Sequence, residues 1–135
     1  MDTNTVSYLI ERRPSIVAKV GEIGGPNALS IPTIALAEAR VGITTMPAGA
    51  RKATLLAALE ALLATGIEVR PFTTEAAVVF SEAGAKLQAA GVGIDFPDLC
   101  MASVAIAENK TLVSNDGVFY HVQRVCGLRF ERWEP

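Results

Sequence analysis

The chain has 135 residues, half of them apolar, and its 14 acidic and 12 basic side chains leave a formal net charge of −2. This length is enough for one domain with a hydrophobic core. No apolar run approaches the roughly 18 residues of a membrane-spanning helix, and no basic leader precedes a long apolar segment, so neither a membrane anchor nor a secretory signal is expected. The small negative charge argues against a broad nucleic-acid-binding face.

That charge balance would change if four of the acids shared one metal site. Twelve bases would then face ten remaining acids, and the outer surface would carry a net charge of +2. Such a surface permits nucleic-acid binding without predicting it. The two cysteines, Cys100 and Cys126, form no CxxC motif, and Cys100 lies in an apolar helical pattern that predicts burial. A reducing, cytoplasmic setting is therefore expected.

The first half of the chain shows mainly helical patterns, punctuated by Pro and Gly. Pro14 suits a first helical turn, and Thr33 is the predicted N-cap of a helix that Gly42 ends. The predicted elements are an apolar segment over residues 5–11, a helix over 14–23, a turn over 24–27, a strand over 28–31, a helix over 33–42, a break over 46–49 and a Leu-rich helix over 51–65.

The second half alternates strands and helices. The predicted elements are a strand over residues 67–70, a helix over 74–91, a helix from about 97 to 108, a strand over 111–114, a turn over 115–117, a brief helix over 118–122 and a strand near 128–132. Because the strands are short and apolar, they favour a parallel sheet covered by helices on both faces. We therefore predict a single α/β domain spanning residues 1–135, without repeat or linker.

Four acids stand at the positions where such a sheet places its ligand site, beyond the carboxyl ends of the strands. Asp2 precedes the first apolar segment, Glu38 lies on the helix after the strand over 28–31, Asp98 lies in the first turn of a later helix, and Asp116 directly follows the strand over 111–114. Four carboxylates in one site repel one another and raise their own pKa values. A hard divalent cation removes this conflict, and oxygen ligands suit Mg²⁺ or Mn²⁺.

Each acid also has a simpler interpretation. Asp2 would lie in a frayed, solvated terminus, and Asp98 would favour the positive end of its helix. Glu38 would be solvated or paired with Arg40 or another base, and Asp116 would belong to a plain turn with the glycine that follows it. Taken singly, these interpretations are about as good as the functional one, because short motifs carry a real risk of false matches.

The residues around these acids resemble those of PIN-domain nucleases of the VapC toxin type. Taken together, the matching segments span nearly the whole chain in the family's order and spacing. They are Asp2-Thr3-Asn4, Ser7-Tyr8-Leu9-Ile10, Ile34-Ala35-Leu36-Ala37-Glu38, Pro97-Asp98-Leu99, Leu112-Val113-Ser114-Asn115-Asp116 and the segment from Val125 to Trp133.

The resemblance implies a PIN-like three-layer sandwich and a metal-dependent endoribonuclease that hydrolyses RNA phosphodiester bonds. It implies catalytic roles for four acids: Asp2, Glu38, Asp98 and Asp116. Of these, Asp2, Asp98 and Asp116 are the expected metal ligands, while Asn4 and Ser114 match polar positions that organise the site. It further implies a toxin that a cognate antitoxin neutralises, commonly as a homodimer, with operator DNA reached only through the antitoxin.

In one respect the chain departs from the family. Family members usually have several apolar residues before the first acid, forming the strand that presents it, whereas here only Met1 precedes Asp2. Either that strand is nearly absent or further residues lie upstream. A shortened strand loses ladder hydrogen bonds and places a charged α-amino group beside the expected metal site. Metal affinity and activity are the properties that this would affect.

Other surfaces have two interpretations each. Arg12, Arg13, Arg51 and Lys52 are candidate contacts to the RNA backbone, although a solvated face is the simpler explanation. The helix over 51–65 and the helix bearing Glu38 are candidate dimer surfaces, with core packing as the alternative. His121 is expected to be structural or exposed.

Two other functions compete with the nuclease. A catalytically weak PIN module would act mainly as the antitoxin's partner in operator DNA binding. A phosphatase or other hydrolase has less support, because the chain has no GxSxG, P-loop or cysteine-nucleophile motif.

Overall fold

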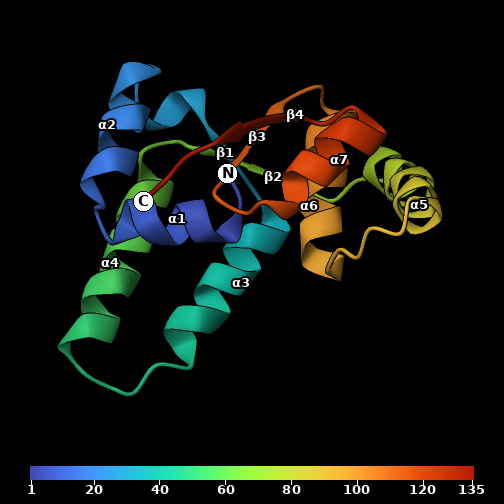
Figure 1. Ribbon diagram of the computed structural model, residues 1–135. Coiled ribbons are helices and arrows are strands. Elements are labelled where there is room, and N and C mark those ends of the chain that lie inside the picture. The colour runs from blue at the N-terminus through green and yellow to red at the C-terminus, as the bar shows by residue number, and fades with distance from the viewer.

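The structure, a computed structural model, describes all residues from Met1 to Pro135. Seven α-helices, one short 3-10 helix and four short strands follow one another along the chain (Figure 1). The helices and strands are α1 Thr3–Ile10, α2 Pro14–Glu22, η1 Pro26–Ala28, β1 Ser30–Pro32, α3 Thr33–Thr44, α4 Ala50–Ala64, β2 Glu68–Arg70, α5 Thr74–Ala89, α6 Phe96–Ala107, β3 Thr111–Ser114, α7 Val118–Cys126 and β4 Arg129–Arg132.

The strands form two parallel pairs, β1 with β2 and β3 with β4. The first two residues join these pairs: the Met1 ammonium donates to the Ser30 carbonyl of β1 at 2.8 Å, and the Asp2 N–H donates to the Val113 carbonyl of β3 at 3.0 Å. The N-terminus accordingly lies among the strands in Figure 1. The predicted parallel sheet is therefore present as two halves, joined by a central element of two residues.

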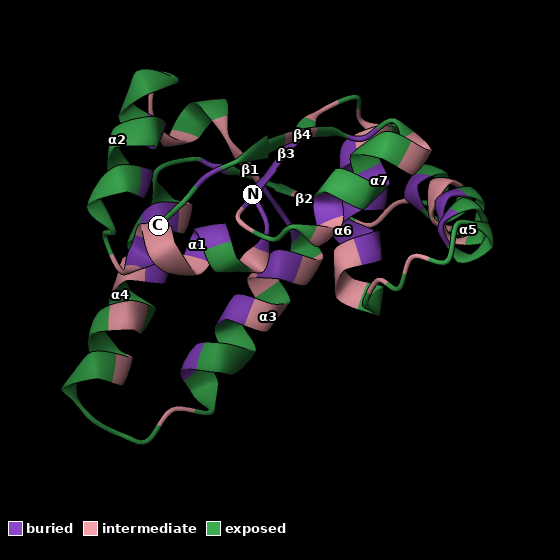
Figure 2. Cartoon of the chain, in the orientation of Figure 1, coloured by how far each residue is buried: buried purple, intermediate pink, exposed green.

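Helices cover this sheet on both faces, which confirms the predicted three-layer α/β sandwich. One buried cluster joins α1, α2, α3 and α4 to β1 and includes Ile16, Ile31 and Leu59. A second cluster joins α5, α6 and α7 to β3 and includes Leu87 and Phe119. Figure 2 shows buried and exposed residues alternating along most of the helices, whereas most of α6 is buried. Because burial of these apolar faces drives the assembly, the helices are held on the sheet by two hydrophobic clusters.

The boundaries of α3 differ from the prediction. Pro32, not Thr33, is the N-cap, and Thr33 is the first helical residue and is exposed. The helix also passes through Gly42 and ends at Thr44. Ile43 is only 5% exposed and packs in the first core, so its burial extends the helix beyond a residue that usually ends one.

The Leu-rich helix α4 packs mainly into the first core. Leu59 and Leu62 are buried, while Leu56 is 41% exposed. Core packing therefore accounts for most of its apolar face. As predicted, Cys100 is buried; it and Cys126 are free thiols. No helix of the fold has both the length and the apolar run needed to cross a membrane.

Candidate active site

Asp2 is the most enclosed of the four candidate acids. Its residue is only 3% exposed, and it is the N-cap of α1, where its Oδ1 accepts a hydrogen bond from the Thr5 N–H at 2.8 Å. The Asp-x-x-Thr spacing produces this cap locally, because an N-cap carboxylate reaches the amide three residues later. The frayed-terminus interpretation of Asp2 is therefore wrong.

Ser114, at the end of β3, holds the other oxygen of that carboxylate. Its hydroxyl donates to Asp2 Oδ2 at 2.5 Å and accepts from the Asp116 N–H at 2.9 Å. The residue is fully buried. One hydroxyl thus connects two of the candidate acids, a placement in keeping with the expected organising role of Ser114.

Glu38 lies on α3 and contacts the start of α1. The Thr3 hydroxyl donates to Glu38 Oε2 at 2.5 Å, and Glu38 is half-buried. The predicted alternative partner, Arg40, forms an ion pair of 2.6 Å with Glu60 on α4 instead. Glu38 consequently has a hydroxyl rather than a base beside it.

Asp98 lies in the first turn of α6, as predicted. The pKa of this carboxyl is raised to about 6, mainly by burial and in addition by the negative charges of the other three candidate acids and of Asp95. Mutual repulsion was expected for acids gathered into one site. The shift shows that Asp98 lies within electrostatic reach of the other three.

Asp116 is the most open of the four acids. It is exposed, and its Oδ1 accepts from the Val118 N–H at 2.8 Å, which fits the predicted turn. The same residue also contributes to the raised pKa of Asp98. The turn interpretation is therefore correct, and it places Asp116 beside the other acids.

The four acids converge without forming a closed ligand set. No group of three or more Asp, Glu, His or Cys side chains lies close enough together to hold a metal ion. The available donors are carboxylate oxygens, which match Mg²⁺ and Mn²⁺ in kind. Since Mg²⁺ usually keeps several waters and takes only one or two carboxylates, an open arrangement of this type fits its coordination chemistry.

Asn4 is exposed, and none of its side-chain atoms makes a hydrogen bond within the chain. The structure thus brings Ser114 but not Asn4 into contact with the acids. His121 is exposed, as expected; its ring lies 3.3 Å from Arg124.

Two side chains at or beside this site were not predicted from the sequence. Thr3 holds Glu38, and the Asn115 amide donates to the Tyr8 hydroxyl at 3.3 Å, while its Oδ1 is buried without a partner. Both Thr3 and Asn115 lie directly next to a candidate acid or organising residue in the sequence. That adjacency was the only signal available, because both partners lie far away along the chain.

The positions of the cavities do not coincide with the positions of the four acids. The largest, of about 480 Å³, lies under Met1 between β1 and β3 and contains none of the four. A smaller cavity of about 250 Å³ is lined by Thr3, Ser7 and Glu38 and continues to Arg51. The acids therefore lie at an open edge rather than in a deep pocket.

Known proteins are similar to this chain in sequence and in fold. The PIN domain family model matches residues 1–125. Ribonuclease VapC2 of Rickettsia felis is 30% identical over 135 residues, covering 99% of this chain and 96% of that protein. Plasmid stability protein StbB of Pseudomonas syringae pv. tomato is 31% identical over 119 residues, 86% of each chain.

Solved structures of related proteins have a similar fold. The Rickettsia felis VapBC2 complex bound to a promoter DNA fragment matches with a TM-score of 0.81 and 28% identity, covering 98% of this chain and 96% of the other. DNA-bound VapBC of Salmonella typhimurium matches with a TM-score of 0.83 and 26% identity, at the same coverage. The sheet edge with its acids and the match over nearly the full length lead to one conclusion: the chain belongs to the PIN-domain family and is homologous to VapC.

Proposed function

We propose that this protein is a metal-dependent endoribonuclease that hydrolyses RNA phosphodiester bonds and acts as the toxin of a toxin–antitoxin pair. The observation that carries the proposal is the arrangement of the four acids. The Ser114 hydroxyl links the Asp2 carboxylate to the Asp116 N–H, Thr3 beside Asp2 holds Glu38, and burial together with the charges of the other three raises the pKa of Asp98. A ribonuclease relative and relatives in VapBC complexes, which form a family of toxin–antitoxin systems, support it. RNA as the substrate makes the cytoplasm the expected compartment.

The proposed cofactor is Mg²⁺ or Mn²⁺, which Asp2, Asp98 and Asp116 would hold directly or through coordinated waters. When bound, such a cation lowers the pKa of a coordinated water and neutralises charge on phosphate oxygens. The Asp98 carboxylate, whose pKa is raised to about 6, must lose its proton before it can bind a cation. Metal affinity is therefore expected to increase as the pH passes through that range.

The remaining roles belong to the chain's own side chains. Ser114 keeps the Asp2 carboxylate in one orientation through the 2.5 Å hydrogen bond. Thr3 does the same for Glu38, which we assign to orienting the attacking water or to metal binding. Asn4 is assigned to contacts outside the chain, because its exposed amide has no intramolecular partner.

Among the candidate RNA contacts, Arg12 has the strongest case. Arg13 and Arg51 form ion pairs with Glu11 at 3.0 and 3.5 Å. Lys52 donates to carbonyl oxygens at the end of α3 and in the loop that follows. Arg12 is exposed and has no ion pair, so its charge is free to meet a phosphate.

The test compares two substitutions on α6. Asp98→Asn removes the central carboxylate, and RNA cleavage with Mg²⁺ or Mn²⁺ should fall at least about 100-fold. Asp95→Asn is the matched control, because Asp95 is exposed, lies three residues earlier and makes no cap hydrogen bond; it should stay within about threefold of the parent. Equal cleavage by Asp98→Asn and the parent would contradict the proposed site.

A second candidate function is an antitoxin-binding module for operator DNA with little cleavage. Two observations favour it: no three acids lie in a ligating group, and two related complexes are bound to DNA. In this case the purified protein would leave RNA intact in Mg²⁺ and in Mn²⁺. It would still shift operator DNA together with its antitoxin, and the Asp98→Asn protein would do so equally well.

We propose a homodimer through the outer faces of α3 and α4. Val41 on α3 is 61% exposed and Leu56 on α4 is 41% exposed, and a partner copy would cover both. The alternative is that they are single exposed apolar residues, which are normal on a protein surface. Light scattering after size-exclusion chromatography tests the proposal. A parent protein of monomeric mass, or a Val41→Arg variant that keeps a dimeric mass, would rule out this face.

A further inference from the structure

The cavity of about 250 Å³ beside Glu38 has no role in the chemistry proposed above. It lies between α1, α3 and α4, and we call it the side cavity. Six of its lining residues define it: Ser7, Glu38, Gly42, Ile43, Met46 and Arg51. Because Glu38 is both a candidate acid and part of this lining, a molecule bound at the acids can extend directly into the side cavity.

The buried side chains that line the side cavity are apolar. Ile10, Ala39 and Ile43 are each at most 8% exposed and belong to the first core, so their positions are fixed by packing. Met46 is half-buried and adds a flexible thioether, which adapts its shape to a neighbouring group. The lining therefore favours a ligand with an apolar face.

The polar groups at the inner end of the side cavity are free to accept hydrogen bonds but not to donate them. The Ser7 hydroxyl already donates to the Thr3 carbonyl at 2.9 Å, and the Thr3 hydroxyl already donates to Glu38. A hydroxyl whose proton is used still has lone pairs, and an ionised carboxylate only accepts. A ligand that satisfies these groups must present N–H or O–H donors.

The outer end of the side cavity is positively charged. A neighbouring cavity shares Glu11 and Arg51 with it and is also lined by Arg12 and Arg13. Glu11 pairs with Arg13 at 3.0 Å and with Arg51 at 3.5 Å, so one carboxylate serves two guanidinium groups. Three bases therefore face one acid, and this surplus of positive charge attracts phosphate.

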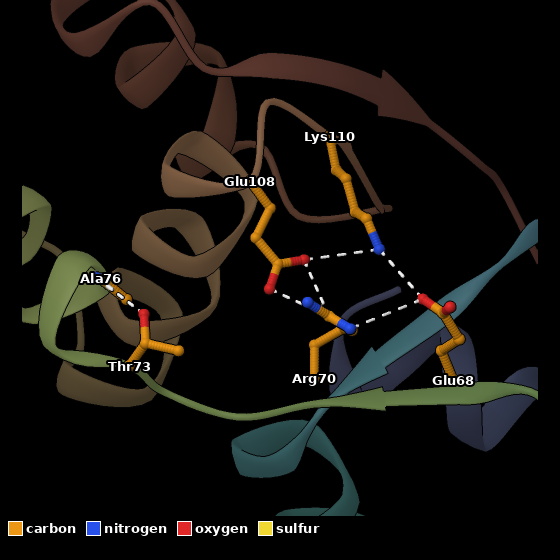
Figure 3. A network of polar contacts seen from close by, with 6 residues as sticks. All are labelled: Glu68, Arg70, Thr73, Ala76, Glu108 and Lys110. Atoms are coloured by element: carbon orange, nitrogen blue, oxygen red, sulfur yellow. Dashed lines mark hydrogen bonds and ion pairs between the residues drawn. The ribbon is translucent and has the colours of Figure 1, made fainter.

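A second cluster of charged side chains, formed by Glu68, Arg70, Glu108 and Lys110, has no such surplus. These side chains form ion pairs of 3.0 to 3.9 Å, in which each one contacts both members of the opposite sign (Figure 3). Two acids balance two bases, so a phosphate could bind there only by disrupting existing pairs. The outer end of the side cavity is the better phosphate site.

We propose that the side cavity binds one unpaired nucleobase of the RNA substrate, and that the phosphate on the far side of this nucleotide lies against the arginines around Glu11. The proposal rests on the proposed nuclease function and adds a specificity site to it. Proteins recognise unpaired bases in this way, by apolar contact with the base and hydrogen bonds to its edge.

The acceptors of the side cavity also predict which bases it prefers. Adenine, cytosine and guanine each carry an amino group that donates hydrogen bonds, whereas uracil has carbonyl oxygens at the corresponding positions. Carbonyl oxygens would face the lone pairs of Ser7 and Thr3 without a proton between them. The three bases with an amino group should therefore bind more tightly than uracil.

Gly42 permits a sharp test, because it lines the side cavity and a Cβ added to it would meet no atom within 4 Å. Gly42→Leu should place a side chain in the cavity, and leucine also favours the helical conformation of α3. Gly21→Leu is the matched control, because Gly21 lies within α2, has equally open surroundings and does not line the side cavity. Both variants should have a Tm at or above that of the parent.

With RNA as the substrate, Gly42→Leu should raise KM about tenfold or more and leave kcat nearly unchanged, because base binding acts equally on the ground and transition states. Gly42→Ala adds a single carbon and should have a smaller effect, whereas Gly21→Leu should stay within about twofold of the parent. An unchanged KM in the folded Gly42→Leu protein would overturn the proposal. If that protein instead no longer bound the antitoxin, the cavity would belong to the antitoxin.

Mononucleotides provide a second readout, which needs no cleavage because they contain no phosphodiester bond between nucleotides. In the parent protein with Mg²⁺, titration with AMP, CMP or GMP should shift the NMR signal of the Met46 methyl group at concentrations roughly fivefold lower than UMP requires. Gly21→Leu should keep this response and Gly42→Leu should lose it. The response in a protein that leaves RNA intact would refute the proposed function and support the nucleotide site. No response to any of the four nucleotides would overturn the site itself.

Discussion

The Ser114 hydroxyl donates a hydrogen bond of 2.5 Å to the Asp2 carboxylate, joining residues that lie 112 positions apart in the chain. The same hydroxyl accepts from the Asp116 N–H. One buried side chain therefore orients the first candidate acid and the turn that carries the last. Its loss should affect both catalysis and folding.

Ser114→Ala should lower RNA cleavage about tenfold, because a carboxylate without its organising partner loses its orientation. It should also lower the free energy of unfolding by about 1–3 kcal/mol, since the Asp116 N–H loses its acceptor. Urea titration and a cleavage assay measure the two effects. Ser103→Ala is the control: its hydroxyl is equally buried but donates to the Leu99 carbonyl. Loss of cleavage to the same degree in both variants would show that Ser114 acts only through stability.

Asp98→Asn should make the metal-free protein more stable at pH 7 by about 1 kcal/mol, a value reduced for the solvent screening of a half-buried carboxyl. The pKa of Asp98 is about 6 in the fold against 3.8 for the free group. The folded protein therefore binds more protons than the unfolded chain between these values, and stability falls as the pH rises from about 4 to 6. Thermal unfolding in a chelator should show this slope for the parent and not for the variant. An identical slope in both would refute the assignment to Asp98.

The Met1 ammonium should produce the opposite slope at higher pH. Its pKa is about 6 in the fold and 8.0 in the free state, so between these values the unfolded chain binds more protons and stability rises with pH. Tm measurements from pH 6 to 8 should show the rise in the parent. A variant with the residues Met-Asn-Gly added ahead of Met1 has no amine at Met1, and in it the rise should disappear. A rise of equal size in that protein would trace the effect to another group.

Glu38→Gln should reduce cleavage at least about 100-fold with little change in stability. The amide keeps the shape and still accepts from Thr3, but it has neither the charge nor the basicity of the carboxylate. Glu60→Gln on α4 is the matched control, because Glu60 forms an exposed ion pair with Arg40, which contributes less than about 1 kcal/mol. Comparable cleavage by the Glu38→Gln protein and the parent would remove Glu38 from the mechanism.

The local parts of this fold could be predicted from the chain because each depends on neighbours in the sequence. Periodic apolar residues placed the helices, and Gly127 at φ 72 ends α7 as a glycine C-cap does. Even so, α7 continues to Cys126, beyond the predicted end near Val122. The end of α3 also differs from the prediction, because burial of Ile43 outweighs the preference of Gly42 for a helix end.

The candidate site was predictable in its members but not in its contacts. The positions of Asp2, Asp98 and Asp116 follow from strand exits and first helical turns, which local patterns reveal. Nothing local indicates that Thr3 would meet Glu38, because that contact depends on how α1 crosses α3.

The sequence by itself therefore determined the alternation of helices and strands and the parallel character of the sheet, and it singled out the four acids that we propose for the site. Only the tertiary structure decided that Asp2 is buried, that Ser114 holds it and that the sheet is divided around Met1. The physical reason is that propensity and periodicity act between near neighbours. Hydrogen bonds such as those from Met1 to Ser30 and from Asp2 to Val113 form only when packing brings distant segments together.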